Sequence, residues 1–552
     1  MIDYRQLRHS CAYFLLAFFL LLSPIAALCS GAEFIIFHTS DIHGSISAHP
    51  DPTAKEEPKP LIGGFAVLKK LMDNYKNDPA HAKARFLYFD SGDYFQGTPI
   101  VDRTKGSVMI DMFNRVGVNA VTIGNHDFDY TYQNLKEQFK NRKFPVICCN
   151  VIENSTGKIP DFAVPFKVFS HNGKKIGLIG IDTPATKMMS IEANVKDLEF
   201  LAPAPLVEKY VKLLRNSGVD FIALLSHLGI DDDIKLLVEQ VRGIDIVFGG
   251  HSHILKKGIE TFGPDNTILI HSGSSLEHTS ILTVKLEDDG SKKIFLKSQP
   301  LYVDEIGSDN KISAVEEEYL KEIKKEMSRV IGVSKVNLYR GINGGDSPEG
   351  SFIADAMRKA VNADFAFINF GGVRQPIYKG TITVEHIFLV QPFSNVIEVL
   401  DMTGAQIKEM IEKYLSNDFQ PMNDNDKAYA LDHFNIRADG LRMIVGPYYG
   451  YLFPSNLKIT FDPARPAMQR LISVERIDGK QLVDNETYKV ALNDFLASGG
   501  DGFLFLKDIK NRYKSSILVR DALIKYIEEN KVIESKPEKR MHNVRLNEES
   551  LD

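Results

Sequence analysis

Five short apolar segments of this chain each end in side chains that can bind a metal ion. Each segment has the length and the β-branched or aromatic character of a buried strand. The polar residues that follow them are Asp41-Ile42-His43, Asp93, Asn125-His126-Asp127, His227 and His251-Ser252-His253. Because the carboxyl ends of strands in an open α/β sheet form one ligand-binding edge, we expect these side chains to lie together. Their number and type are enough for two metal ions with positions left for water and substrate.

Each of these motifs alone has a structural explanation. An Asp-x-His sequence after a strand is often a turn with a capping aspartate, and Gly-Asn-His-Asp is typical of turns. His251 and His253 could be a hydrogen-bonded structural pair. The ordered set of five makes the metal site the better interpretation.

The pattern of hydrophobicity predicts two α/β domains joined by a helix. From Glu33 to about Val303, apolar runs alternate with amphipathic segments, which is typical of an α/β domain whose sheet is covered on both faces. Apolar residues then recur at helical spacing over 311–331, which we interpret as a connecting helix. A second α/β domain follows from about Gly332. The predicted strands are 34–37, 86–89, 120–123, 146–149, 176–181, 221–225, 244–248, 268–270, 365–369 and 488–491, and the predicted helices include 65–72, 108–116, 206–214, 234–241 and 351–361.

The first 32 residues have the layout of a secretory signal. Arg5 and Arg8 precede an apolar run over 12–22, which is followed by Pro24 and small residues up to Ala32. We expect cleavage after Ala32 and export to a periplasm or to the outside of the cell. The alternative is an uncleaved membrane anchor, since 12–29 is nearly long enough to span a bilayer. No second apolar segment of spanning length follows, so no membrane span is expected after cleavage.

Charge and cysteine content argue against nucleic-acid binding and against a structural disulfide. The net charge of −6, from 66 basic and 72 acidic residues, gives no electrostatic basis for binding nucleic acid. Cys148 and Cys149 are the cysteines left after the signal segment. Adjacent Cα atoms are about 3.8 Å apart, which is too close for an unstrained disulfide. We expect the two thiols on opposite faces of a buried strand.

Two sets of motifs resemble known families. The set Asp41-x-His43, Gly92-Asp93, Gly124-Asn125-His126-Asp127, Ser226-His227 and Gly250-His251-x-His253 resembles the calcineurin-like metallophosphoesterases. The later motifs Asn369-Phe370-Gly371-Gly372-Val373-Arg374, Gln391-Pro392-Phe393 and Asn493 to Gly502 are similar to the C-terminal domain of exported 5′-nucleotidases. The resemblance implies an α/β/β/α metallophosphoesterase sandwich over 33–310, a linker helix over 311–331 and a second α/β, substrate-binding domain over 332–547.

The resemblance also implies a centre of two divalent ions that share one carboxylate. Asp41, His43, Asp93 and His253 would hold the first ion, and Asp93, Asn125, His227 and His251 the second. The mixed ligand set suits zinc, manganese, cobalt, iron or magnesium. His126 would face the transferring phosphoryl group, and Asp129 would orient it and keep it protonated. The structural alternative is that Asp129 caps a helix beginning near Tyr130.

Residues of the second domain would hold a nucleotide. By the same resemblance, Phe393 and Phe495 would sandwich the base, Asp501 would accept hydrogen bonds from the ribose, and Asn369 and Arg374 would contact phosphate or ribose. On composition alone the two phenylalanines would be core residues. Arg340 matches a family arginine, with a solvated surface charge as the alternative. Some relatives keep a further arginine nearby, whereas here no arginine follows Arg340 until Arg358.

The function that follows is hydrolysis of nucleoside 5′-monophosphates by an exported enzyme with two metal ions, with closure of the domains about the 311–331 helix. The alternatives are a broader hydrolase acting on nucleoside diphosphates, nucleotide sugars or 2′,3′-cyclic nucleotides, and a sulfur-compound hydrolase. A non-catalytic nucleotide-binding protein is the alternative from another class. Base preference, native metal and oligomeric state are left open by the sequence.

Overall fold

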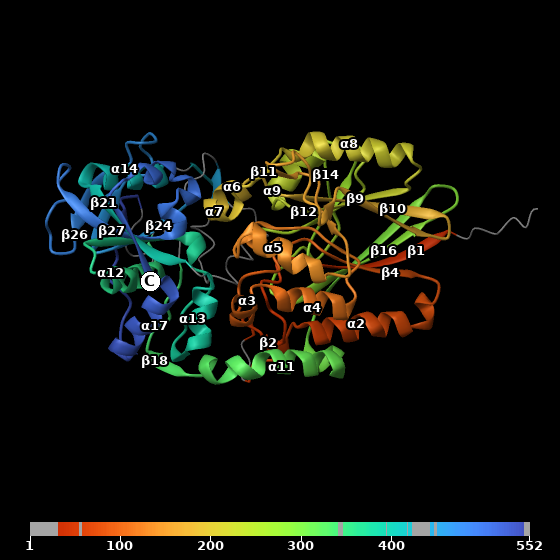
Figure 1. Ribbon diagram of the computed structural model, residues 1–552, viewed down its shortest axis with the longest axis horizontal. Coiled ribbons are helices and arrows are strands. Elements are labelled where there is room, and N and C mark those ends of the chain that lie inside the picture. Colours follow the sequence, from red (N-terminus) through yellow and green to blue (C-terminus); the bar gives the residue numbers. More distant parts are fainter. Residues whose placement is uncertain are drawn as a thin grey trace, which may run out of the picture.

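A computed structural model describes residues 31–54, 58–340, 346–393, 395–416, 418–421, 442–445 and 450–545. The chain forms two α/β domains that lie side by side along the longest axis of the molecule (Figure 1). Of the predicted signal segment, residues 1–30 lie outside the described residues. Ala32 is the first residue of strand β1 (Ala32–Thr39) and pairs with Leu286, so cleavage after Ala32 would remove one residue of that strand.

Two large sheets form the centre of the N-terminal domain. The first has seven strands in the order β17-β16-β1-β4-β5-β6-β8, and the second has six in the order β14-β15-β13-β12-β10-β9. The strands that carry the site are β1, β4 (Arg85–Asp90) and β5 (Ala120–Val121) in the first sheet and β12 (Phe221–His227) and β13 (Ile246–Gly249) in the second. The remaining strands are β6 (Val146–Ile147), β8 (Ala163–Val164), β9 (Phe166–His171), β10 (Lys174–Asp182), β14 (Glu260–Phe262), β15 (Thr267–His271), β16 (His278–Leu286) and β17 (Lys292–Pro300).

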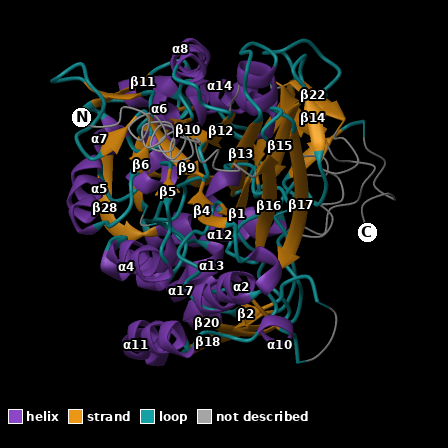
Figure 2. Cartoon of the chain, turned by 90° about the vertical axis from the view of Figure 1, so that its right-hand side faces the viewer, coloured by secondary structure: helices purple, strands orange, loops and turns teal. Residues whose placement is uncertain are grey.

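The two sheets pack face to face and helices cover their outer faces. Phe34, Ile36 and Phe89 of the first sheet share a core with Phe221 and Phe248 of the second. Helices α2 (Phe65–Asn77) and α4 (Ser107–Val116) cover the first sheet, and α8 (Pro203–Asn216) covers the second. The strands therefore lie between α8 and the α2–α4 pair, both in Figure 1 and in Figure 2, where strands are orange. This is the α/β/β/α order that the resemblance implies, and it explains why the strands are apolar on both faces.

Parallel pairing brings the polar ends of the strands together. Thr39 of β1 lies opposite Asp90 of β4, and in the second sheet Ser226 of β12 lies opposite Gly249 of β13. The segments after these strands therefore emerge at the same edge. Cys148 belongs to the core under the first layer of helices and Cys149 to the core under α8, which confirms the predicted opposite orientation of the two free thiols.

The connecting helix is shorter than its apolar pattern predicts. Helix α11 (Asn310–Met327) begins at the N-cap Asp309, whose side chain accepts hydrogen bonds from two backbone N–H groups. The expected end at Ile331 is wrong, because strand β18 (Val330–Ser334) begins there and pairs with β20 (Gly380–Thr383). Val330 continues the helical spacing but is 59% exposed in the strand. In Figure 1, α11 runs beneath the N-terminal domain toward β18.

The C-terminal domain has a five-stranded sheet in the order β24-β19-β27-β21-β28. Its strands are β24 (Leu452–Ser455), β19 (Phe365–Asn369), β27 (Thr487–Asn493), β21 (Val396–Thr403) and β28 (Arg512–Leu518). Helices α12 (Pro348–Ala360), α13 (Val384–Val390) and α17 (Val519–Asn530) pack on one face, and α14 (Gly404–Leu415) packs on the other. The parallel neighbours β19 and β27 end in Asn369 and Asn493, next to the predicted nucleotide-binding motifs.

Most predicted elements occur at their predicted places, with one change of type. The segment predicted as a helix over 234–241 is a π-helical stretch, Asp233–Val238. Among the described residues, no helix combines the length and apolar character needed to cross a bilayer.

Candidate active site

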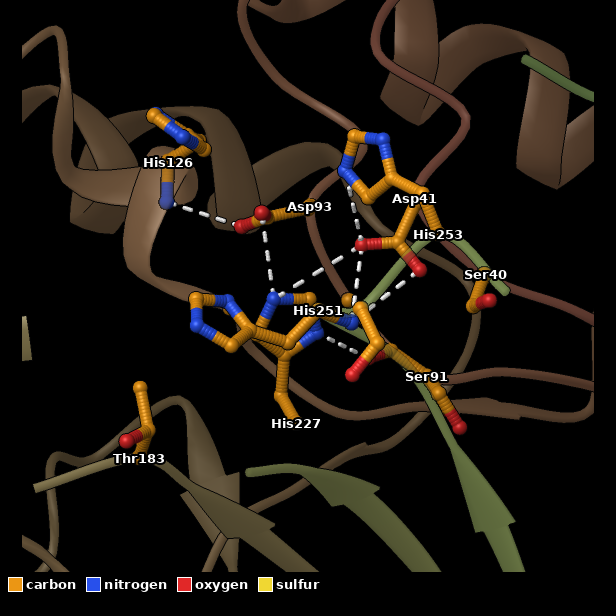
Figure 3. Close-up of polar contacts among 12 residues, drawn as sticks. Ser40, Asp41, Ser91, Asp93, His126, Thr183, His227, His251 and His253 are labelled. Atoms are coloured by element: carbon orange, nitrogen blue, oxygen red, sulfur yellow. Dashed lines mark hydrogen bonds and ion pairs between the residues drawn. The ribbon is translucent and has the colours of Figure 1, made fainter. Parts of the chain in front are cut away.

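Two groups of metal-binding side chains lie at the common edge of the two sheets. Asp41, His43 and His253 form one group, and Asp93, His227 and His251 form the other, with the candidate ligand atoms of each group within 4.8 Å of one another. These are six of the seven predicted ligands. They come from loops after β1, β4 and β13 and from the end of β12 (Figure 3).

Asp93 lies between the two groups. Its Oδ2 atom is 3.1 Å from Nε2 of His227 in its own group and 3.8 Å from Nε2 of His43 in the other. Its Oδ1 atom accepts a hydrogen bond from the backbone N–H of His126 at 2.8 Å, which leaves Oδ2 directed at the imidazoles. Asp93 therefore faces candidate ligands of both groups.

The residues present fit a metal centre. Asp93 Oδ2, Asn125 Oδ1 and His227 Nε2 are buried polar atoms that have no hydrogen-bond partner among the described residues. Such atoms are rare in folded proteins unless an ion or water satisfies them. Asn125, the seventh predicted ligand, belongs to neither group, but its buried carbonyl oxygen is left without a hydrogen-bond partner within the described part of the chain.

The hydrogen bonds around the ligands orient them for a cation. His227 donates from Nδ1 to the carbonyl oxygen of Ser91 at 2.6 Å, so Nε2 is the nitrogen left to face a cation. Both carboxylate oxygens of Asp41 accept from the backbone N–H of His251, at 2.9 and 3.1 Å (Figure 3). Burial lowers the pKa of His43 and of His251 to about 3, so both imidazoles are neutral, which is the form that binds a metal.

The backbone at these ligands is strained. Five of the six residues in the two groups have φ between 48° and 72°: Asp41, His43, Asp93, His251 and His253. L-residues with side chains adopt this left-handed region at a cost, and such strain gathers at functional sites. Tight turns directly after the strands direct the ligand side chains back toward one point.

Asp127 holds two of the ligand loops together. Its carboxylate accepts hydrogen bonds from the backbone N–H groups of Asp93, Tyr94 and Phe95 at 3.0–3.1 Å and of Gly124 at 2.8 Å. Asp127 belongs to the Gly124-Asn125-His126-Asp127 motif, but local sequence gives it no role. The distinguishing feature is tertiary, because its partners lie about thirty residues away on another loop.

His126 and Asp129 form a hydrogen-bonded pair beside the metal-binding groups. Nδ1 of His126 donates to Oδ2 of Asp129 at 2.9 Å. Burial opposes the charged form of His126, but the carboxylates of Asp129 and Asp93 outweigh burial and raise its pKa above the usual value. The imidazole is therefore predisposed to carry a proton.

One cavity joins this pair to the second domain. It has a volume of about 860 Å³, part of it open to solvent, and its lining comes from both domains. The predicted residues that line it are Asn125, His126, Asp129, Asn369, Arg374, Phe393, Phe495 and Asp501, and Gln96 and Asn493 line it as well. The ring of Phe393 lies 5.5 Å from that of His126, centroid to centroid.

Polar residues of the C-terminal domain form a connected row in this cavity. Asn369 donates from Nδ2 to Asp501 at 2.8 Å and accepts from Nδ2 of Asn493 at 2.9 Å. Burial raises the pKa of Asp501 to about 6, against the opposing effect of the Asn369 hydrogen bond. Arg374 places its guanidinium carbon 5.8 Å from the centre of the Phe393 ring.

Arg340 does not lie among the residues that line the cavity. Its guanidinium donates to the carbonyl oxygens of Val373 and Phe370, at 2.6 and 3.3 Å, and stacks 3.7 Å from the centre of the Phe370 ring. It is 7% exposed, so it is not the solvated surface charge of the alternative. Its contact with substrate stays a prediction. Its contacts support the loop that ends in Arg374.

The fold and this site define a metal-dependent phosphoesterase. Residues 34–255 match the calcineurin-like phosphoesterase family and residues 330–508 match the 5′-nucleotidase C-terminal domain. The chain therefore belongs to the calcineurin-like phosphoesterases that carry a 5′-nucleotidase C-terminal domain.

Relatives and solved structures agree with this assignment. The chain is 27% identical to a 5′-nucleotidase of Diplobatis ommata over 562 aligned positions, which cover 93% of this chain and 91% of the relative. The crystal structure of a 5′-nucleotidase precursor from Thermus thermophilus matches with a TM-score of 0.78 and 26% identity, over 93% of this chain and all of the other. The sulfate thiohydrolase SoxB of Thermus thermophilus shares the fold, with a TM-score of 0.73 and 18% identity over 94% of this chain and 97% of its own.

Proposed function

We propose that the protein is an exported enzyme that uses two divalent metal ions to hydrolyse nucleoside 5′-monophosphates to nucleoside and phosphate. The observation that supports this most directly is the shared cavity. On one side it is lined by Asn125 and by the His126–Asp129 pair, and on the other by Phe393 and Phe495. Phosphoryl chemistry and base binding would thus occur in one cavity.

The two groups of ligands suit a pair of ions that lower the pKa of a water molecule and stabilise charge on a transferring phosphoryl group. Asp41, His43, Asp93 and His253 would hold one, and Asp93, Asn125, His227 and His251 the other. His126 would donate a proton or hydrogen bond from Nε2, because Nδ1 is already engaged by Asp129. Asp129 keeps the imidazole in that orientation.

The C-terminal domain would bind the nucleoside. Phe393 and Phe495 would stack on the two faces of a base, and stacking of this kind is sequence-tolerant because every base has a π-face. Asp501 and Asn369 would bind ribose hydroxyls, and Arg374 would contact the phosphate. Arg340 would act indirectly, by supporting the loop that carries Arg374.

Export is proposed from residues 1–32, whose basic, apolar and small-residue regions have the order of a secretory signal. Two relatives are named as snake venom 5′-nucleotidases, from Gloydius brevicauda and Naja atra, which supports action outside the cell. Cys148 and Cys149, the cysteines of the described residues, are free thiols, so an exported enzyme would rest on its apolar cores and bound metal.

The test is release of phosphate from AMP by protein beginning at Gly31, so that strand β1 is intact. The protein is first treated with a chelator, and manganese, zinc, cobalt or magnesium is then restored. We expect metal-dependent release that is lost in Asp93→Ala and His126→Ala. Release from ADP, a nucleotide sugar or a 2′,3′-cyclic nucleotide in place of AMP would retain the site and change the substrate. Binding of AMP without turnover on any ester would reject the catalytic proposal.

A further inference from the structure

Gln96, which lines the cavity, combines a strained backbone with a buried amide that lacks a hydrogen-bond acceptor among the residues that the structure describes. Its φ of 65° lies in the left-handed region, although it is neither glycine nor asparagine. Its side chain is 2% exposed, and Nε2 has no hydrogen-bond partner within the described ranges of the chain. The residue lines the same cavity as His126 and Arg374.

The left-handed backbone at Gln96 is imposed by its neighbours. On one side, Phe95 donates its N–H to Oδ1 of Asp127 at 3.0 Å. On the other side, Gly97 lies so close to the His43 loop that a Cβ there would come within 2.2 Å of the carbonyl oxygen of His43. The segment between Asp93 and Gly97 is therefore fixed at both ends against loops that carry metal ligands.

Glycine would occupy position 96 at the lowest cost if only chain geometry mattered. A glutamine at a left-handed position must be explained by its side chain, yet within the described residues its amide nitrogen donates to nothing. Backbone strain and an unsatisfied buried donor both occur at functional sites, where a ligand completes the interaction. The geometry therefore indicates a bound group that Nε2 contacts.

The missing partner must be a hydrogen-bond acceptor, since an amide NH₂ only donates. Other donors that line the same cavity include the imidazole of His126 and the guanidinium of Arg374. Donors that converge on one space favour an oxyanion with several acceptor oxygens. Gln96 also follows Asp93 by three residues, so it belongs to the phosphoryl side of the cavity rather than to the side with Phe393 and Phe495.

We propose that Gln96 is a further substrate-binding residue, which donates a hydrogen bond from Nε2 to an oxygen of the phosphoryl group. This inference rests on the proposed hydrolysis of phosphate esters. It assigns a role in recognition of the phosphoryl group that is independent of the nucleobase. The strained backbone holds the amide in place before the substrate binds, which limits the entropy lost on binding.

The experiment compares wild type with Gln96→Gly and Gln96→Glu, all loaded with the metal that supports activity. Gln96→Gly removes the donor and relieves the left-handed strain, whereas Gln96→Glu keeps the shape and replaces the donor with an acceptor. Three quantities are measured: kcat/KM on AMP and on p-nitrophenyl phosphate, the affinity for inorganic phosphate by calorimetry, and the melting temperature. We expect kcat/KM on both esters and the affinity for phosphate to fall about 10- to 100-fold in both variants. The melting temperature of Gln96→Gly should equal or exceed that of wild type.

Asn172→Gly is the matched control, because Asn172 is left-handed as well, with φ of 46°, but lies in the turn between β9 and β10. We expect it to leave activity and phosphate affinity unchanged. The proposal is overturned if either Gln96 variant keeps phosphate affinity and kcat/KM within twofold of wild type. It is also overturned if only the rate on AMP falls, since the contact would then be with the nucleoside. Wild type that turns over neither ester would reject the proposed function, while the calorimetric comparison would still decide on Gln96.

Discussion

Asp102 and Arg520 form an ion pair across the two domains, with Nη2 of Arg520 3.0 Å from Oδ2 of Asp102. Asp102 belongs to helix α3 (Pro99–Thr104) of the N-terminal domain, and Arg520 to α17 of the C-terminal domain. Arg520 also donates to the carbonyl oxygen of Pro392, the residue before Phe393, at 3.4 Å. The pair thus links contact between the domains to the loop that carries one of the proposed stacking residues.

We expect Asp102→Asn to weaken the contact between the domains by about 2 kcal/mol, because it leaves the buried guanidinium of Arg520 without its charge partner. In kinetic terms, KM for AMP should rise several-fold more than kcat falls. Small-angle X-ray scattering of the unliganded protein should report a more extended molecule. Lys105→Met removes an exposed partner of Asp102 and serves as the control, with an expected effect below about 0.5 kcal/mol. An unchanged scattering profile and KM in Asp102→Asn would contradict the role of this pair.

Asp127 and Asp129 allow two functions to be separated by a matched pair of variants. Asp127→Asn places an amide donor among four backbone N–H groups, so the loops of Asp93 and Asn125 should separate and metal affinity should fall about 10- to 100-fold. Asp129→Asn should keep the metals but lower kcat, because His126 loses the carboxylate that favours its protonated form. Chelator competition measures the first effect and kinetics at saturating metal the second. Equal metal affinity in the two variants would contradict the role assigned to Asp127.

Phe393→Ala and Phe495→Ala should each weaken the binding of AMP by about 1–3 kcal/mol of lost stacking, which appears as a rise in KM. Neither should change kcat/KM on p-nitrophenyl phosphate, which has no base to stack. Phe295→Ala, at a phenylalanine that is 58% exposed on β17, is the control for a general loss of stability. Parallel losses on AMP and on p-nitrophenyl phosphate would assign both rings to the core instead.

Glu316 of helix α11 should make stability depend on pH. Burial raises its pKa to about 7, although its carboxylate accepts a hydrogen bond from the N–H of Ala66 at 2.8 Å. Because the folded pKa is above the unfolded value of about 4.5, the folded state retains a proton that the unfolded chain releases. This residue's contribution is therefore most favourable below pH 4.5 and is lost as the pH rises toward 7.

Glu316→Gln keeps the hydrogen-bond acceptor and removes the titration. We expect the variant to be more stable than wild type at pH 8, by up to about 3 kcal/mol, and the difference to fall to about 1 kcal/mol at pH 5. Thermal unfolding across this range measures the difference. A difference that does not change between pH 5 and pH 8 would show that Glu316 does not titrate as its burial requires.

The polar ends of the strands could be predicted because they depend on local order along the chain. A short apolar run followed directly by Asp41 or His227 specifies both a strand and a ligand at its carboxyl end. The order of the motifs was also sufficient to recognise both domains. For the same reason the His126–Asp129 pair, whose members are only three residues apart, could be predicted from the sequence.

Properties that depend on contacts between distant segments were not accessible in this way. Apolar runs do not say whether they share one sheet. The two packed sheets were expected only from the family resemblance, and strand pairing shows which strands belong to each. Val330 satisfies a helical pattern equally well, but pairing with β20 places it in a strand. Arg340 was assigned to the substrate by its motif. Its hydrogen bond to Val373 and its stacking on the ring of Phe370 are contacts that the motif did not predict.

The sequence thus established the identity of the chemical groups and their attachment to strands, since both are local properties. Their convergence, the loops joined by Asp127, the strain at Gln96 and the Asp102–Arg520 pair belong to the tertiary structure. The reason is physical: each depends on distances between segments far apart in the chain, up to 418 residues for Asp102 and Arg520. Such distances are set by how sheets and domains pack, which local spacing does not encode.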